Sequence, residues 1–123
     1  MILVDSSVWI DHFRSNNDAL AEMLRENLVA THPFVIGELA CGNLRNRGNI
    51  LADLAALPRL APVRDEFVLH FIDEHALWGK GIAWIDVHLL AGARLANCRL
   101  WTFDKALLRA EQLVSHPRRK AHP

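Results

Sequence analysis

Short apolar runs alternate along the chain with longer segments whose apolar residues recur three or four positions apart. The runs of strand length cover residues 2–5, 28–31, 60–63 and 98–103. The amphipathic segments predict helices over about 7–13, 20–28, 33–42, 50–57, 66–78, 84–97 and 105–113. Asp65 and Asp104 are expected to cap the helices that follow them. This alternation predicts an α/β fold with a central, mostly parallel sheet of four or five short strands sandwiched by helices.

The pattern continues without a repeat or a linker, so we expect one domain over residues 1–114. Residues 115–123 contain the run HPRRK and predict a disordered basic tail, with solvation as its role and weak attraction of RNA as the alternative. No apolar run approaches the roughly 18 residues of a membrane span, and the N-terminus lacks the features of a signal peptide. We therefore expect a cytoplasmic protein with no membrane partner.

The amino-acid composition limits the partners, disulfides and metal sites that can be expected. Lys and Arg together number 14, as do Asp and Glu, so no net positive charge indicates a nucleic-acid partner. The two cysteines, Cys41 and Cys98, are too few for a disulfide framework, and their apolar neighbours predict buried reduced thiols. The 7 histidines lack the spacing of metal ligands and are expected to be structural or on the surface.

Four acidic residues lie next to apolar runs or on apolar helical stripes, where carboxylates are unusual. Asp5 and Asp104 follow predicted strands, at the sheet edge where open parallel sheets form their active sites, although each alone is also explained as a helix N-cap. Glu38 lies on an apolar helical stripe with no basic residue three or four positions away. Asp86 lies on a similar stripe, where the helix dipole is the alternative explanation.

One arrangement accounts for all four acids. If they converge, their mutual repulsion raises their pKa values unless a cation neutralises them. Oxygen ligands without His or Cys favour Mg²⁺ or Mn²⁺. Such a site activates water and holds a phosphate oxygen, which predicts phosphodiester hydrolysis.

Four segments carry a family resemblance. They are ILVDSS at 2–7, IGELACG at 36–42, WIDVH at 84–88 and LWTFD at 100–104. In this order and with these apolar flanks, the chain closely resembles PIN-domain ribonucleases, and it is most similar to the small bacterial VapC-type toxins. The resemblance implies a parallel sheet covered by helices, an endoribonuclease dependent on Mg²⁺ or Mn²⁺, a homodimer, and inhibition by a small cognate antitoxin.

The resemblance also implies roles for individual residues. The quartet that binds metal and orients the attacking water is Asp5, Glu38, Asp86 and Asp104. Ser6 and Thr102 match the small hydroxyl residues that accompany the first and last acids. The implied mechanism is in-line attack of metal-activated water on RNA, without a covalent enzyme intermediate. Some relatives carry a further acid soon after the fourth, and here the next one is only Glu111, which leaves one or two metals open.

Two alternatives remain open at this stage: a structure-specific DNA nuclease with a PIN-like fold, and a non-catalytic PIN-like module that binds RNA or a protein. The excess of apolar residues between Leu20 and Leu57 predicts a groove for a protein partner. Several arginines are candidates for contacting RNA phosphates, and solvated helix faces explain them equally well: Arg14, Arg45, Arg47, Arg94 and Arg109.

Overall fold

The computed structural model describes residues 1–115, in which a parallel sheet forms the centre of the molecule. Its strands are β1 (Ile2–Val4), β2 (Val29–Ala30) and β3 (Arg99–Trp101), in the order β2-β1-β3. Leu3 pairs with Ala30 on one side and with Leu100 on the other. The central strand β1 is buried on both faces, which is why its sequence is an unbroken apolar run.

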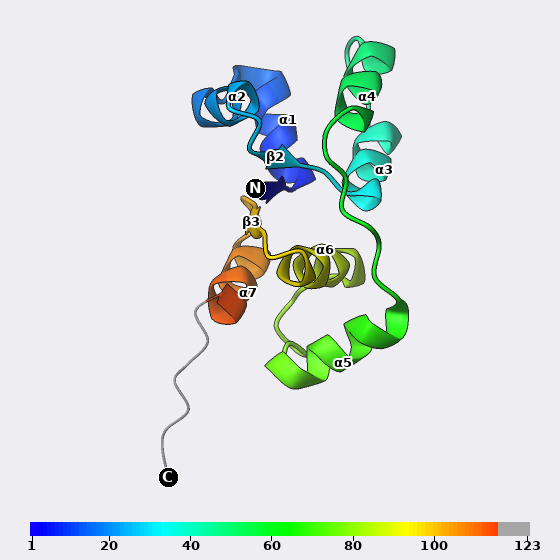
Figure 1. Ribbon diagram of the computed structural model, residues 1–123, viewed down its shortest axis with the longest axis vertical. Helices are drawn as coiled ribbons and strands as arrows, with labels where there is room; N and C mark the ends of the chain where they lie inside the picture. Colours follow the sequence, from blue (N-terminus) through cyan, green and yellow to red (C-terminus); the bar gives the residue numbers. More distant parts are fainter. Residues whose placement is uncertain (116–123) are drawn as a thin grey trace.

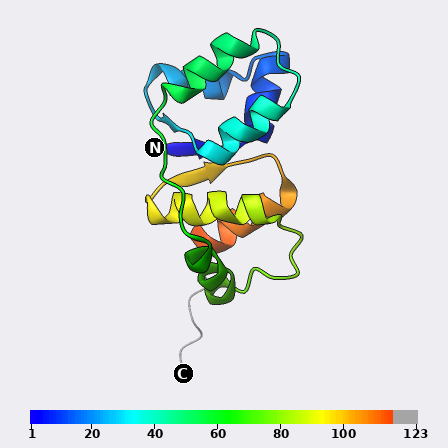
Figure 2. The ribbon, with the colours of Figure 1, turned by 90° about the vertical axis from the view of Figure 1, so that its right-hand side faces the viewer.

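Helices cover both faces of this sheet (Figures 1 and 2). One side carries α1 (Ser6–Ser15), α2 (Asp18–Arg25), α3 (Pro33–Cys41) and α4 (Arg47–Ala55). The other side carries α5 (Asp65–His75), α6 (Trp84–Leu95) and α7 (Lys105–Ser115). There α6 and α7 pack against β3, and α5 packs against α6. The predicted α/β sandwich is confirmed. Ser115, the first residue of the predicted disordered tail, is instead the last residue of α7, and residues 116–123 lie outside the described residues.

The sheet is smaller than predicted in the part of the chain that the structure describes. Residues 60–63, a predicted strand, form none, and the chain makes a single parallel bridge between Thr31 and Arg59 instead. Pro58 and Pro62 flank this bridge. Because proline has no N–H to donate, the ladder cannot extend in either direction.

Two local predictions are wrong. Asp65 does not cap α5, because it is the first residue of that helix and its Oδ1 hydrogen-bonds His88 Nε2 at 3.1 Å. His88 is buried, so this bond ties α5 to α6. The thiols are also less buried than expected, since Cys41 is exposed and Cys98 is half-buried. Within residues 1–115, none of the helices combines the length and apolarity needed to cross a membrane.

Glu111 joins α7 to β3 through a buried carboxylate that is 2% exposed. Arg99 donates to it through Nε at 2.8 Å and through Nη2 at 3.0 Å. The Leu100 amide and the Ser115 hydroxyl donate at 3.3 and 2.8 Å. Burial acts to raise the pKa of Glu111, but these hydrogen bonds and the Arg99 charge outweigh it and hold the pKa below its ordinary value of 4.5. This carboxylate is fully engaged in holding the fold.

Replacing Glu111 with Gln should therefore destabilise the protein by about 2 kcal/mol at pH 7, as measured by urea unfolding. Since the folded-state pKa lies below the unfolded one, the carboxylate stabilises the fold fully above about pH 4.5 and ceases to do so as the pH falls through the folded-state pKa. The difference between the two proteins should thus shrink in acid. Glu22→Gln, which breaks an exposed pair with Arg25, should cost less than about 0.5 kcal/mol. Equal stability of the Glu111→Gln protein and the parent at pH 7 would contradict this role.

Candidate active site

Asp5 lies where β1 ends and α1 begins, and its carboxylate is 4% exposed. Its amide donates to the Trp101 carbonyl at 2.9 Å, which continues the pairing of β1 with β3. Oδ1 accepts from the Ser6 amide at 2.8 Å and so caps α1. Oδ2 accepts from Thr102 Oγ1 at 2.7 Å and from Ser7 Oγ at 2.9 Å. Asp5 is therefore a helix cap and also a carboxylate held rigidly at the sheet edge.

Thr102 connects the first acid to the last. While its hydroxyl donates to Asp5, it accepts from the Asp104 amide at 3.0 Å. Asp104 Oδ1 in turn accepts from the amides of Ala106 and Leu107 at 2.9 and 3.2 Å, which confirms the predicted cap of α7. The side chain of Asp104 is otherwise exposed to solvent.

Glu38 reaches the same edge from α3. Its Oε1 accepts from Ser6 Oγ at 3.2 Å, so Ser6 stands between the first and second acids. Within residues 1–115 Glu38 makes no ion pair, and its side chain is exposed rather than buried with the apolar stripe of α3. Partial burial and the charge of Asp5 raise the pKa of Glu38, while the Ser6 hydrogen bond acts in the opposite direction.

Asp86 completes the group from the first turn of α6, where it is half-buried. Burial is the first cause that raises the pKa of Asp86, to about 6, and the charges of the other three acids add to it. No ion pair to Asp86 exists within the described residues. The fold thus brings the four predicted acids into one mutually repulsive group, and within residues 1–115 no cation pairs with Asp86.

The donors of this group suit a hard divalent cation, because they are carboxylates and hydroxyls only. Within residues 1–115, however, no three side chains of His, Cys, Asp or Glu stand close enough together to hold an ion by themselves. Mg²⁺ commonly binds through one or two carboxylates and keeps several of its waters. The residues therefore fit a hydrated Mg²⁺ or Mn²⁺ ion rather than a closed cage of side chains.

Ser7 is the residue that sequence reasoning missed. Its Oγ donates to Asp5 Oδ2, accepts from the Phe103 amide at 3.0 Å and lies 3.3 Å from Thr102 Oγ1. The signal was the pair of hydroxyl residues directly after Asp5. Because consecutive residues in the first turn of a helix point in different directions, one hydroxyl meets Glu38 and the other meets the loop after β3.

The family model of the PIN domain matches residues 2–113 of this chain. The chain belongs to the PIN domain family, which confirms the resemblance inferred from its motifs. It is 42% identical over 108 residues to "Ribonuclease VapC32" of Mycobacterium tuberculosis (strain CDC 1551 / Oshkosh), an alignment that covers 87% of each chain. The protein of the same name from strain ATCC 25618 / H37Rv matches to the same extent.

Proposed function

We propose that the chain is an endoribonuclease that uses Mg²⁺ or Mn²⁺ bound at Asp5, Glu38, Asp86 and Asp104. The observation that carries this proposal is the convergence of four acids at the carboxyl edge of the sheet, where no cation of residues 1–115 pairs with Asp86. The name of the relatives, ribonuclease, supports RNA as the substrate.

Each side chain has a task that its contacts support. A bound divalent ion would supply charge for a phosphate oxygen and activation of the attacking water. Asp5, held by Ser7 and Thr102, is the rigid acid of the group. Glu38 and Asp86, whose pKa values are raised, are the acids whose ionised forms gain most from a nearby cation. Ser6 and Thr102 orient the acids beside them.

The proposed partners are a small cognate antitoxin and a second copy of the chain, with the protein acting as a cytoplasmic toxin. The VapC name of the relatives supports an antitoxin. A cavity of about 200 Å³ between α1, α2 and α4 offers an apolar surface for it, with lining residues that include Trp9, Phe13, Leu24, Leu54 and Leu57. The exposed apolar residues of the α5–α6 side support a homodimer: Leu69, Trp78 and Trp84.

Purified protein should cleave structured cellular RNA when Mg²⁺ or Mn²⁺ is present and leave it intact in EDTA. Asp86→Asn keeps the size of the side chain and removes its charge, so it should slow cleavage by about 100-fold or more. Asp73→Asn changes an exposed acid of α5 and should leave the rate unchanged. RNA left intact with both metals, or full activity of Asp86→Asn, would contradict the proposal. A flap DNA substrate assayed in parallel distinguishes a DNA nuclease.

Metal binding should raise the unfolding temperature, because a ligand that binds only the folded state stabilises it. At ten times its dissociation constant, Mn²⁺ should add about 1.4 kcal/mol, or roughly 4 °C. Asp5→Asn should remove this increase, whatever its own starting stability, while Asp73→Asn should retain it. An increase of equal size in Asp5→Asn would show that Asp5 is a helix cap and not a metal ligand.

The chain expressed alone should have a mass twice its own 13.9 kDa by light scattering. Expressed together with the small protein encoded beside its gene, it should co-purify with that protein. Leu57→Lys places a charge in the apolar cavity and should weaken the complex, whereas Leu95→Lys, at a side chain that is 65% exposed on α6, should not. A parent chain that purifies without that protein after co-expression would contradict the antitoxin proposal.

A further inference from the structure

A second cavity, of about 580 Å³, adjoins the acid group between α1, α3 and the connection to α4. Glu38 belongs to both, so the cavity opens directly beside the candidate metal site. Its floor is apolar and includes Phe13 and Leu39, while Asn43 and the arginines Arg14 and Arg45 supply polar groups. Its volume falls in the range of about 300–1,000 Å³ that is typical of sites for small ligands.

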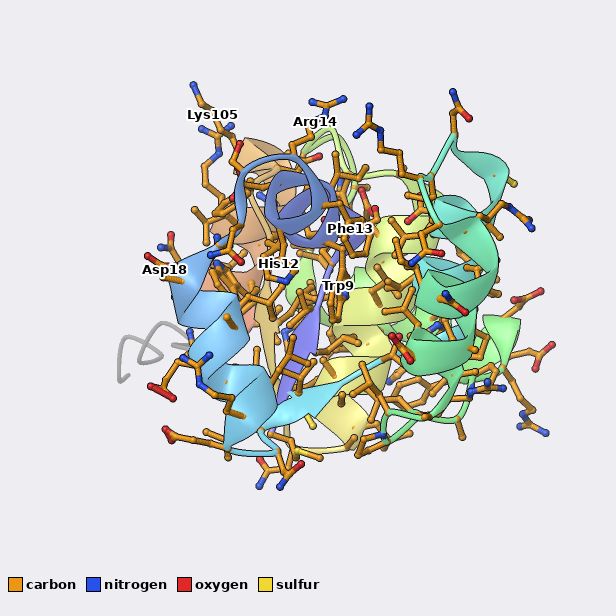
Figure 3. All side chains as sticks on the ribbon, turned by 90° about the horizontal axis from the view of Figure 1, so that it is seen from above. Trp9, His12, Phe13, Arg14, Asp18 and Lys105 are labelled. Carbon is orange, nitrogen blue, oxygen red and sulfur yellow. The ribbon has the colours of Figure 1, made fainter. Side chains whose placement is uncertain are left out.

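Within residues 1–115, some arginine side chains hydrogen-bond other groups of the protein and others do not. Arg47 donates to the Ala40 carbonyl at 3.0 Å, at the end of α3, and Arg99 is bound to Glu111. Within residues 1–115, Arg14 and Arg45 make neither an ion pair nor a side-chain hydrogen bond, and both are exposed. Figure 3 shows Arg14 pointing outward from α1, while Phe13 points toward the space beside α3 and α4.

The two other candidates for RNA contacts lie elsewhere. Arg94 is on α6 and Arg109 is on α7, and both helices cover the opposite face of the sheet from α1 and α3 (Figure 2). Arg14 and Arg45, by contrast, line the same cavity as Glu38, an acid of the site.

The charge around the acid group explains why Arg14 and Arg45 matter for binding RNA. The acid group repels a polyanion, and the net formal charge of the chain is +0, so attraction for RNA must come from cations placed near the site. Guanidinium groups bind phosphate through paired hydrogen bonds as well as charge. The apolar side chains that line the same cavity, among them Phe13 and Leu39, suit a nucleobase.

We propose that Arg14 and Arg45 bind a phosphate of single-stranded RNA next to the bond that is cut, and that the cavity holds the nucleotide attached to it. The proposal rests on the ribonuclease function proposed above and adds the path of the strand: from the acid group past Glu38 toward the connection between α3 and α4. Arg14 and Arg45 are then substrate-binding residues, whereas Arg47 shapes the connection.

Titration of a fluorescein-labelled single-stranded RNA against NaCl tests this proposal, in EDTA so that the RNA stays intact. Each lost phosphate contact should reduce the slope of log K against log salt by about 0.7. Arg14→Ala and Arg45→Ala should each reduce the slope, and the double variant, which removes the whole contact to that one phosphate, should lose about 0.7. Arg14→Lys and Arg45→Lys, which keep the charge, should retain most of the slope. Arg64→Ala, at a side chain that is 86% exposed on the opposite side, should behave like the parent.

Unchanged slopes in both Ala variants, with unchanged unfolding temperatures, would overturn the proposal. If those variants keep the RNA slope but no longer co-purify with the small neighbouring protein, the cavity is a protein site and the proposal is equally overturned. Failure of this proposal can also be told apart from failure of the ribonuclease proposal. If the parent protein cleaves RNA but the Ala variants keep their slopes, only the phosphate-site proposal is wrong. If the Ala variants lose slope but the parent protein cleaves no RNA, only the ribonuclease proposal is wrong.

Discussion

The arrangement of the site depends on one buried carboxylate, that of Asp5. Burying an ionised group is costly unless hydrogen bonds satisfy its oxygens, and three donors from two parts of the chain do so here: the Ser6 amide and the hydroxyls of Ser7 and Thr102. These bonds tie the start of α1 to the loop after β3. Because Asp5 cannot move without leaving its oxygens unpaired, it sets the position of the acids around it.

Capping a helix and forming part of a site are compatible roles for the same side chain. Asp5 and Asp104 each use one oxygen to accept backbone amides, which places them at helix N-termini where negative charge is favoured. Each keeps a second oxygen for other partners. Two of the four acids therefore stabilise the fold, while Glu38 and Asp86 are partly buried among like charges, and burial and then these charges raise their pKa values. This local repulsion is typical of a site built for a ligand, which here would be a cation.

Glu111 is a buried acid with a purely structural role. Arg99, Leu100 and Ser115 satisfy its carboxylate completely, so it holds α7 on the sheet and has no oxygen left for chemistry. The same sorting applies to the arginines, since Arg99 and Arg47 are engaged within the fold and Arg14 and Arg45 are not. The balanced charge of the whole chain thus conceals an acidic group with available cations beside it.

Local sequence determined the three strands, most helices, the Asp104 cap and the four acids, because periodicity, caps and strand ends are properties of short segments. Tertiary structure alone decided that Glu38 is exposed, that Ser7 bonds across to Phe103, and that Glu111 is structural. Each of these depends on a partner distant in sequence or on the packing around it. Periodicity describes which face of an element is apolar, and only the packed fold determines which atoms that face meets.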